Sequence, residues 1–110
     1  MRLIGVNGSP RKNGNTAAML DQALNGARAQ GAQTERIDLY DLKYTGCRSC
    51  FECKRLGGRS FGRCALKDGL TGALEKALGA QALIVASPIY FGDVTGQTRS
   101  FFERLCFPSL

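Results

Sequence analysis

The chain of 110 residues contains no histidine and no long hydrophobic run. The absence of histidine removes the usual general base and the usual imidazole metal ligand, so any chemistry must come from other side chains or from a bound group. The longest apolar stretch, Ala80 to Tyr90, is broken by polar residues and is too short to cross a bilayer. The first residues lead directly into a strand pattern, without the features of a signal peptide. These absences predict a cytoplasmic protein with no membrane partner.

The chain is basic, with 15 Lys and Arg against nine Asp and Glu and a formal net charge of +6. Such a charge attracts anions in general, including nucleic acids and phosphorylated small molecules. The basic residues are spread along the chain from Arg28 to Arg104 without forming a basic helix face, and RNA-binding aromatic motifs and zinc-finger spacings are absent. We therefore expect no nucleic-acid partner, because a phosphorylated ligand explains the charge at least as well.

Strand and helix patterns alternate along the chain. Apolar runs at Leu3–Asn7 and Ala82–Ala86 are typical of strands covered on both faces, and Glu35–Leu39 alternates as a shorter, half-exposed strand. Helical periodicity follows from Thr16 to about Gly31, from an expected N-cap at Asp68 to Gly79, and from Gln97 to Cys106. This order predicts an α/β fold with a doubly wound parallel sheet in three layers, α/β/α.

Only three strands can be placed before the chain ends after its last helix. The third strand, Ala82–Ala86, is then left as an open apolar edge, which is a liability for aggregation or pairing. Either a partner chain covers this edge, or residues 1–110 are an incomplete domain that is truncated after the third strand and its helix. We favour the second interpretation.

Residues Gly8 to Thr16 occupy the expected turn between the first strand and the first helix. A helix N-terminus offers free backbone N–H groups and the positive end of the helix dipole, which together favour a phosphate. The turn adds short donors and positive charge at Ser9, Arg11, Lys12, Asn15 and Thr16. It matches neither a Walker A motif nor a dinucleotide-binding glycine fingerprint. The segment predicts a phosphate-binding loop, and an ordinary Gly/Pro/Asn turn is the alternative.

A second loop, Ser87 to Gly96, follows the strand Ala82–Ala86. Ligands of doubly wound sheets bind beyond the carboxyl ends of the strands, so we expect this loop to face the phosphate-binding loop. Its aromatic residues, Tyr90 and Phe91, either line a ligand or complete the core at the strand end.

Cysteines are concentrated in a segment without regular periodicity at about residues 44–67, which we call the cysteine loop. Cys47, Cys50 and Cys53 form a Cys-x2-Cys-x2-Cys run, and Cys64 follows after ten intervening residues. Structural zinc sites usually separate their cysteines into two pairs, whereas overlapping runs are typical of iron–sulfur clusters. An iron–sulfur cluster, reduced thiols and a zinc site remain the alternatives. Cys106 is expected to be a small buried apolar residue.

The two loops together resemble a known family. Gly8-Ser9-Pro10-Arg11 with Gly14-Asn15-Thr16, Ser87-Pro88-Ile89-Tyr90-Phe91-Gly92, and the segment from Gly96 to Arg104 are similar to the flavodoxin-like NAD(P)H-dependent FMN reductases. The cysteine run resembles that of the iron–sulfur flavoprotein subgroup, although the interval before Cys64 is longer than in that subgroup. The similarity spans nearly the whole chain and corresponds to the N-terminal portion of the family, whose members have two further strands and a third flavin-contacting loop.

The resemblance implies a role for each loop. FMN phosphate would be held by Ser9, Arg11, Asn15 and Thr16, with Lys12 adding charge, and the flavin ring by Pro88, Ile89, Tyr90, Phe91 and Gly92. A [4Fe–4S] cluster would be held by Cys47, Cys50, Cys53 and Cys64. The implied function is electron transfer from NAD(P)H or a ferredoxin to a quinone, flavin or similar acceptor, in a homo-oligomer. The alternatives are an electron carrier without its own substrate and a metal-binding interaction module.

Overall fold

A computed structural model describes the whole chain, residues 1–110. Three strands alternate with three α-helices in the order β1 (Arg2–Asn7), α1 (Asn15–Ala29), β2 (Gln33–Asp38), α2 (Thr71–Gly79), β3 (Ala82–Ala86) and α3 (Gly96–Cys106). Single 3-10 turns occupy Leu39–Asp41, Glu52–Lys54 and Phe107–Ser109. Each predicted strand and helix is therefore present, with ends that agree within three residues.

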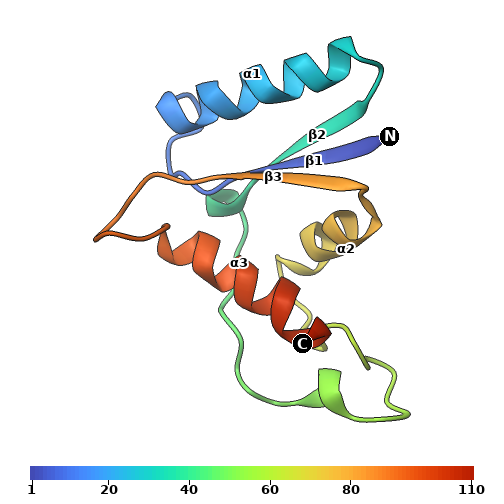
Figure 1. Cartoon of the computed structure of the whole chain (residues 1–110). Coiled ribbons are helices and arrows are strands. Elements are labelled where there is room, and N and C mark those ends of the chain that lie inside the picture. Colours follow the sequence, from blue (N-terminus) through green and yellow to red (C-terminus); the bar gives the residue numbers. More distant parts are fainter.

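The three strands form one parallel sheet in the order β2-β1-β3. Val6 in the central strand lies opposite Ile37 of β2 and Val85 of β3. Helix α1 covers one face of the sheet, and α2 and α3 cover the other (Figure 1). The predicted three-layer α/β/α arrangement is confirmed. Because the chain places β2 on one side of β1 and β3 on the other, strand order reverses between β1 and β3, where doubly wound sheets place their ligands.

Residues of β1 alternate between two apolar clusters. On the α1 face, Leu3 packs with Leu20 and Leu24. On the opposite face, Ile4 and Val6 belong to a larger cluster that takes its other members from β2, α2, α3 and the segments between them: Ile37, Leu39, Leu70, Ala73, Leu74, Ala77 and Phe101. Both faces of the central strand are therefore buried, which accounts for its apolar sequence.

Strand β3 is less covered than its sequence predicts. Its residues are half-buried, and Leu83 is 37% exposed. The reason is that β3 pairs with β1 on one side only, so its other edge has no neighbouring strand within the chain. The expectation of an open apolar edge is confirmed, whereas full burial of both faces is not observed.

Two local expectations were wrong. Asp68 is not the N-cap of α2, because the cap position is occupied by Leu70. The Asp68 carboxylate instead accepts hydrogen bonds from the Leu70 N–H and from the buried guanidinium of Arg104. Cys106 is exposed rather than buried. It lies five residues after buried Phe101, which places it about 140° around the helix from the core-facing side.

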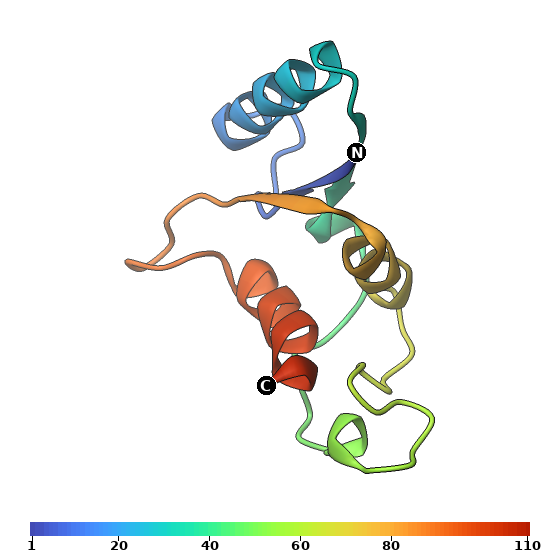
Figure 2. The same cartoon turned by 45° about the vertical axis from the view of Figure 1, so that its right-hand side comes forward.

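The cysteine loop lies outside the layered part of the molecule. It extends beyond the C-terminal end of α3, on the side of the molecule opposite α1 (Figures 1 and 2). Apart from the 3-10 turn at Glu52–Lys54 it contains no helix or strand. The prediction of a long irregular excursion between β2 and α2 is confirmed.

Packing of α1 on the sheet predicts opposite effects for two glycine substitutions. A Cβ atom at Gly5 would lie 2.9 Å from Leu24 and 3.1 Å from Leu20, whereas a Cβ atom at Gly26 in α1 would have no neighbour within 4 Å. We expect Gly5→Val to lower the free energy of unfolding by about 1–3 kcal/mol through overpacking. Gly26→Ala should raise it by roughly 0.5–1 kcal/mol, since alanine favours the helix. Urea denaturation measures both, and equal effects would contradict the described packing.

Candidate functional site

The phosphate-binding loop begins with a tight turn after β1. The Gly8 N–H donates to the Ala86 carbonyl at 2.7 Å, which joins the turn to the end of β3. The Ser9 N–H donates to Asn7 Oδ1 at 3.1 Å, and the Arg11 N–H donates to Ser9 Oγ at 3.1 Å. The Asn7 side-chain amide in turn donates to Asp38 Oδ1 at 2.9 Å. Short polar side chains therefore shape this turn from within.

The N-terminus of α1 is left open to an anion. Its cap residue, Gly14, provides no side-chain hydrogen bond, and the first turn contains no acidic residue. The first helical N–H that finds a backbone carbonyl is that of Ala18, which donates to Gly14, so the N–H groups of Asn15, Thr16 and Ala17 have no partner in the chain. Free N–H groups and the positive end of the dipole make this position suitable for phosphate.

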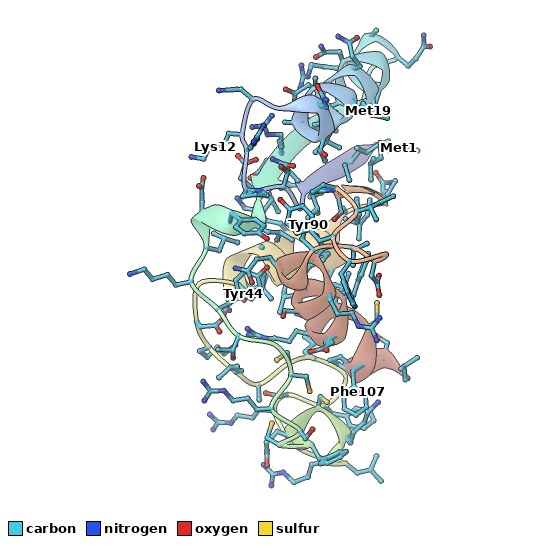
Figure 3. All side chains as sticks on the ribbon, turned by 90° about the vertical axis from the view of Figure 1, so that its left-hand side faces the viewer. Met1, Lys12, Met19, Tyr44, Tyr90 and Phe107 are labelled. Atoms are coloured by element: carbon cyan, nitrogen blue, oxygen red, sulfur yellow. The ribbon has the colours of Figure 1, made fainter.

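The two cations of the loop differ in their surroundings. Lys12 forms an ion pair with Asp41 at 2.7 Å and projects outward from the loop (Figure 3). Its hydrogen bond to the Asp41 carboxylate raises the pKa of Lys12. Arg11 is exposed, and its guanidinium has no ion-pair partner in the chain. Arg11 is therefore the cation that remains free to meet an anion at the α1 N-terminus.

Buried threonines connect the second loop, Ser87 to Gly96, to the phosphate-binding loop. The Thr95 hydroxyl donates to the Gly8 carbonyl at 2.7 Å and lies 2.8 Å from the Thr98 hydroxyl. The Thr95 N–H donates to Ser87 Oγ at 3.0 Å. Thr95 also caps α3 by accepting from the Thr98 N–H. Sequence reasoning missed both threonines, although Thr95 before the helical pattern is a recognisable N-cap signal.

Between these anchors, residues 88–92 form a protruding apolar tip. Ile89 is 81% exposed and Phe91 is fully exposed. Tyr90 and Asp93 exchange backbone hydrogen bonds, which closes the turn. Phe91 has a φ of 52°, an unusual value for a bulky residue and one that costs on the order of 1–3 kcal/mol. The loop thus holds large apolar side chains in solvent at the ligand-binding edge of the sheet, where a planar apolar ligand could cover them.

The four predicted ligand cysteines gather around one cavity. Cys47, Cys50, Cys53 and Cys64 all line a cavity of about 190 Å³, beside Phe51 and Phe107. Phe107 lies next to the 3-10 turn of the cysteine loop (Figure 3), and its ring centroid is 6.0 Å from that of Phe51. The structure contains no group of three or more cysteine, aspartate or glutamate side chains placed so that they could bind one metal ion. The structure therefore brings the cysteines to one place without assembling them into a ligand set.

A buried arginine holds the cysteine loop against α3. The side chain of Arg104 is inaccessible to solvent. It donates from Nε to Cys64 Sγ at 3.3 Å, from Nη2 to the Leu66 carbonyl at 2.9 Å, and from Nη1 to Asp68 at 2.8 Å and the Thr45 carbonyl at 3.2 Å. One guanidinium therefore joins both ends of the cysteine loop, one thiol and the segment before α2. Sequence reasoning did not single out this residue.

The charged forms of both Asp68 and Arg104 are stabilised in the folded protein. Burial by itself would raise the pKa of Asp68, but hydrogen bonds from Arg104 and the Leu70 N–H lower it below the ordinary value. Burial likewise opposes the charge of Arg104, and its hydrogen bonds to Asp68 and Cys64 raise its pKa. A buried cation with a fork of donors also provides a partner for a negatively charged sulfur at Cys64.

The fold and its two facing loops define a doubly wound α/β protein with a candidate phosphate-binding loop at the switch in strand order. Residues 1–109 match the family described as NADPH-dependent FMN reductase. The chain belongs to this family, and the flavodoxin-like fold predicted from the sequence is confirmed. None of its helices has the length and apolar character needed to traverse a membrane.

Curated relatives include several iron–sulfur flavoproteins. One from Methanocaldococcus jannaschii is 36% identical over 104 residues, which are 94% of this chain and 51% of the relative. One from Archaeoglobus fulgidus is 32% identical over 96% of this chain and 46% of the relative, and one from Methanosarcina thermophila is 30% identical over 94% and 52%. The chain thus spans about half the length of the curated relatives it matches.

Two solved structures show the same arrangement of elements. A flavone reductase superposes with a TM-score of 0.68 and 26% identity, covering 94% of this chain and 29% of that protein. The apo form of an NADH:FMN oxidoreductase superposes with a TM-score of 0.67 and 27% identity, covering 94% of this chain and 49% of that protein.

The buried ion pair predicts a large loss of stability for Asp68→Asn. The variant leaves the Arg104 guanidinium buried without a countercharge, so the free energy of unfolding should fall by about 3–5 kcal/mol at pH 7. Urea denaturation measures this change. Glu52→Gln, which removes one partner of the exposed Arg55–Glu52 pair, is the control and should change it by less than about 1 kcal/mol.

The same pair predicts how stability depends on pH. Because the pKa of Asp68 is lowered in the folded state, its contribution is complete above its unfolded value of about 3.9 and is lost as the pH falls through the lower folded value. The difference between the wild type and Asp68→Asn should therefore shrink in this acidic range. A difference that stays constant down to pH 2 would contradict the pairing.

Proposed function

We propose that this chain forms the FMN-binding part of a flavoprotein oxidoreductase. In this function it passes electrons from NAD(P)H or a ferredoxin to a quinone, flavin or similar acceptor. Membership of the NADPH-dependent FMN reductase family supports the class of activity. The names of the relatives, iron–sulfur flavoprotein and NADH:FMN oxidoreductase, support flavin and electron transfer in particular. The same family membership disfavours the alternative of a metal-binding interaction module.

The open N-terminus of α1 beside the second loop is the observation that carries the proposal. The free N–H groups of Asn15 and Thr16, with the Arg11 guanidinium, would bind the FMN phosphate, and Ser9 would keep the turn in shape through its bond from Arg11. Lys12 would act through the net charge of the loop, since its ammonium is engaged by Asp41.

The second loop would position the flavin ring. Pro88 to Gly92 leave β3 at the edge where ligands of doubly wound sheets bind, and Ile89, Tyr90 and Phe91 expose apolar surface there. Bound FMN supplies the redox chemistry, accepting a hydride or single electrons, so the chain needs no histidine. Thr95 would hold the second loop at a fixed distance from the phosphate-binding loop through its bond to the Gly8 carbonyl.

The cysteine loop would hold a [4Fe–4S] cluster on Cys47, Cys50, Cys53 and Cys64. Four thiols are the usual ligand set for such a cluster, and all four line one cavity beside the buried cation Arg104. The donor types and the charge therefore fit the group, although the sulfurs would have to be drawn together around it. Homo-oligomer formation likewise stays a prediction, favoured by the exposed apolar tip at residues 88–92.

The phosphate-binding role predicts selective loss of FMN in Asn15→Asp. A carboxylate in the first turn of α1 would repel the phosphate, and we expect the dissociation constant for FMN to rise about tenfold or more. Helix stability should stay the same or increase slightly, because an acidic residue interacts favourably with the positive end of the dipole. Quenching of FMN fluorescence measures the affinity.

Gln22→Glu is the matched control for this substitution. It adds the same charge on the exposed side of the same helix, away from its N-terminus, and should leave FMN affinity within twofold of the wild type. Equal losses in both variants would reject the assigned phosphate position. With FMN bound, aerobic NAD(P)H oxidation separates a reductase from an electron carrier without its own substrate.

The cluster assignment predicts different results for two cysteine variants. Cys50→Ala should lose iron and acid-labile sulfide in protein prepared without oxygen, together with the broad visible absorption that a cluster adds to flavin bands. Cys106→Ala, which removes an exposed cysteine of α3, should retain both. Wild-type protein that contains flavin but neither iron nor sulfide would reject the cluster and leave the flavin assignment in place.

A further inference from the structure

The net positive charge of the chain comes almost entirely from the cysteine loop. Residues 44–67 contain six of the 15 basic residues and only one of the nine acidic residues, so they carry +5 of the net charge of +6. The other 86 residues carry nine basic and eight acidic side chains and are nearly neutral. Because Lys and Arg are spread along the whole sequence, their positions alone do not reveal this concentration of net charge. Outside the loop, acidic residues balance the basic ones.

Most cations of the loop have no partner inside the molecule. Arg48, Arg59, Arg63 and Lys67 are exposed and form no ion pair. The other two are engaged: Arg55 forms an ion pair with Glu52, and Lys54 Nζ donates to the Phe107 carbonyl at 2.7 Å. Unpaired charges of one sign on one loop repel each other, so the arrangement favours an oppositely charged partner.

These free cations lie at the cysteine cavity or in the hollow next to it. Arg48 lines the cavity that contains the four cysteines. Arg59, Arg63 and Lys67 line a second hollow of about 230 Å³, which shares Cys64 and Arg104 with the first and is therefore next to it. The whole loop projects past the end of α3, away from α1 and the phosphate-binding loop (Figures 1 and 2). The basic surface thus belongs to the cysteines and not to the proposed FMN phosphate.

Large apolar side chains are exposed among the cations. Phe51, Leu56 and Phe61 are 57%, 84% and 54% exposed. Phe51 has a φ of 61°, an unfavourable conformation for a bulky residue. Apolar side chains within a charged rim are the usual composition of a protein–protein interface. A nucleic acid would satisfy the charges, but it would leave the exposed apolar groups and the adjacent cysteine cavity unexplained.

We propose that the cysteine loop is the docking surface for an acidic protein that carries one electron at a time. The charge directs the approach of the partner, and the exposed apolar side chains form the centre of the contact. At each encounter the partner would lose one electron, and the redox group that the proposed function assigns to this chain would gain it. The proposal rests on the proposed redox function and adds to it the surface and the charge of the partner.

Binding of the 110-residue chain to an acidic ferredoxin tests the proposal. Calorimetry or surface plasmon resonance should detect a complex whose dissociation constant rises about tenfold or more between 50 and 300 mM salt. Arg59→Glu and Arg63→Glu should each weaken binding about three- to tenfold at low salt. Arg28→Glu makes the same change of charge at an exposed site on α1 and should weaken it less than twofold. A basic cytochrome c should not bind.

Several results would overturn the docking surface. These are the absence of a complex with the acidic protein, equal weakening by Arg59→Glu and Arg28→Glu, or preferential binding of a DNA or RNA oligonucleotide by the loop. FMN affinity and NAD(P)H oxidation, measured on the same samples, keep the two proposals separate. Arg59→Glu should retain wild-type values for both, whereas a wild-type chain that binds no FMN would reject the proposed function.

Discussion

The buried guanidinium of Arg104 is the constraint on which the position of the cysteine loop against α3 and α2 depends. A buried cation is tolerated only when it is paired and hydrogen-bonded, and Arg104 meets this condition with groups from three separate segments. It connects α3 to the carbonyl of Thr45 at the start of the cysteine loop, to Cys64 near its end, and to Asp68 before α2. The cysteine loop has further contacts with α3 and the turn after it, such as the bond from the Cys47 N–H to Glu103 and the bond from Lys54 Nζ to the Phe107 carbonyl, but Arg104 is the group that joins its two ends.

Helix α3 thereby joins the two functional regions of the chain. Its N-terminus is capped by Thr95, whose hydroxyl also fixes the second loop to Gly8 at the phosphate-binding end. Its last turns carry Arg104 and Glu103, which bind the cysteine loop at Cys64 and at the N–H of Cys47. Eleven residues separate the two ends by roughly 16 Å along the helix axis. A single rigid element thus sets the spacing between the proposed flavin site and the cysteines.

Local patterns predicted those parts of the structure in which neighbouring residues decide the outcome. The apolar runs of β1 and β3 and the periodicity of α1 are strong signals, since both faces of β1 and one face of α1 are buried. Prediction from local patterns failed where a residue distant in the sequence determines the role of a side chain. Asp68 has the sequence position of an N-cap, but in the structure its carboxylate is bound by Arg104, 36 residues later. Nor does the sequence indicate that Lys12 forms an ion pair with Asp41, 29 residues later.

The sequence by itself determined the alternation of strands and helices, the turn proposed to bind phosphate and the run of three cysteines followed by a fourth, because these depend on residue type and spacing. The parallel order of the strands also predicted that this turn faces the loop after β3. Only the tertiary structure decided which bonds join the two loops, from Gly8 to Ala86 and from Thr95 to Gly8. It also decided that the four cysteines line one cavity, next to a hollow lined by unpaired cations. These pairings join residues far apart in the chain, and local spacing carries no information about them.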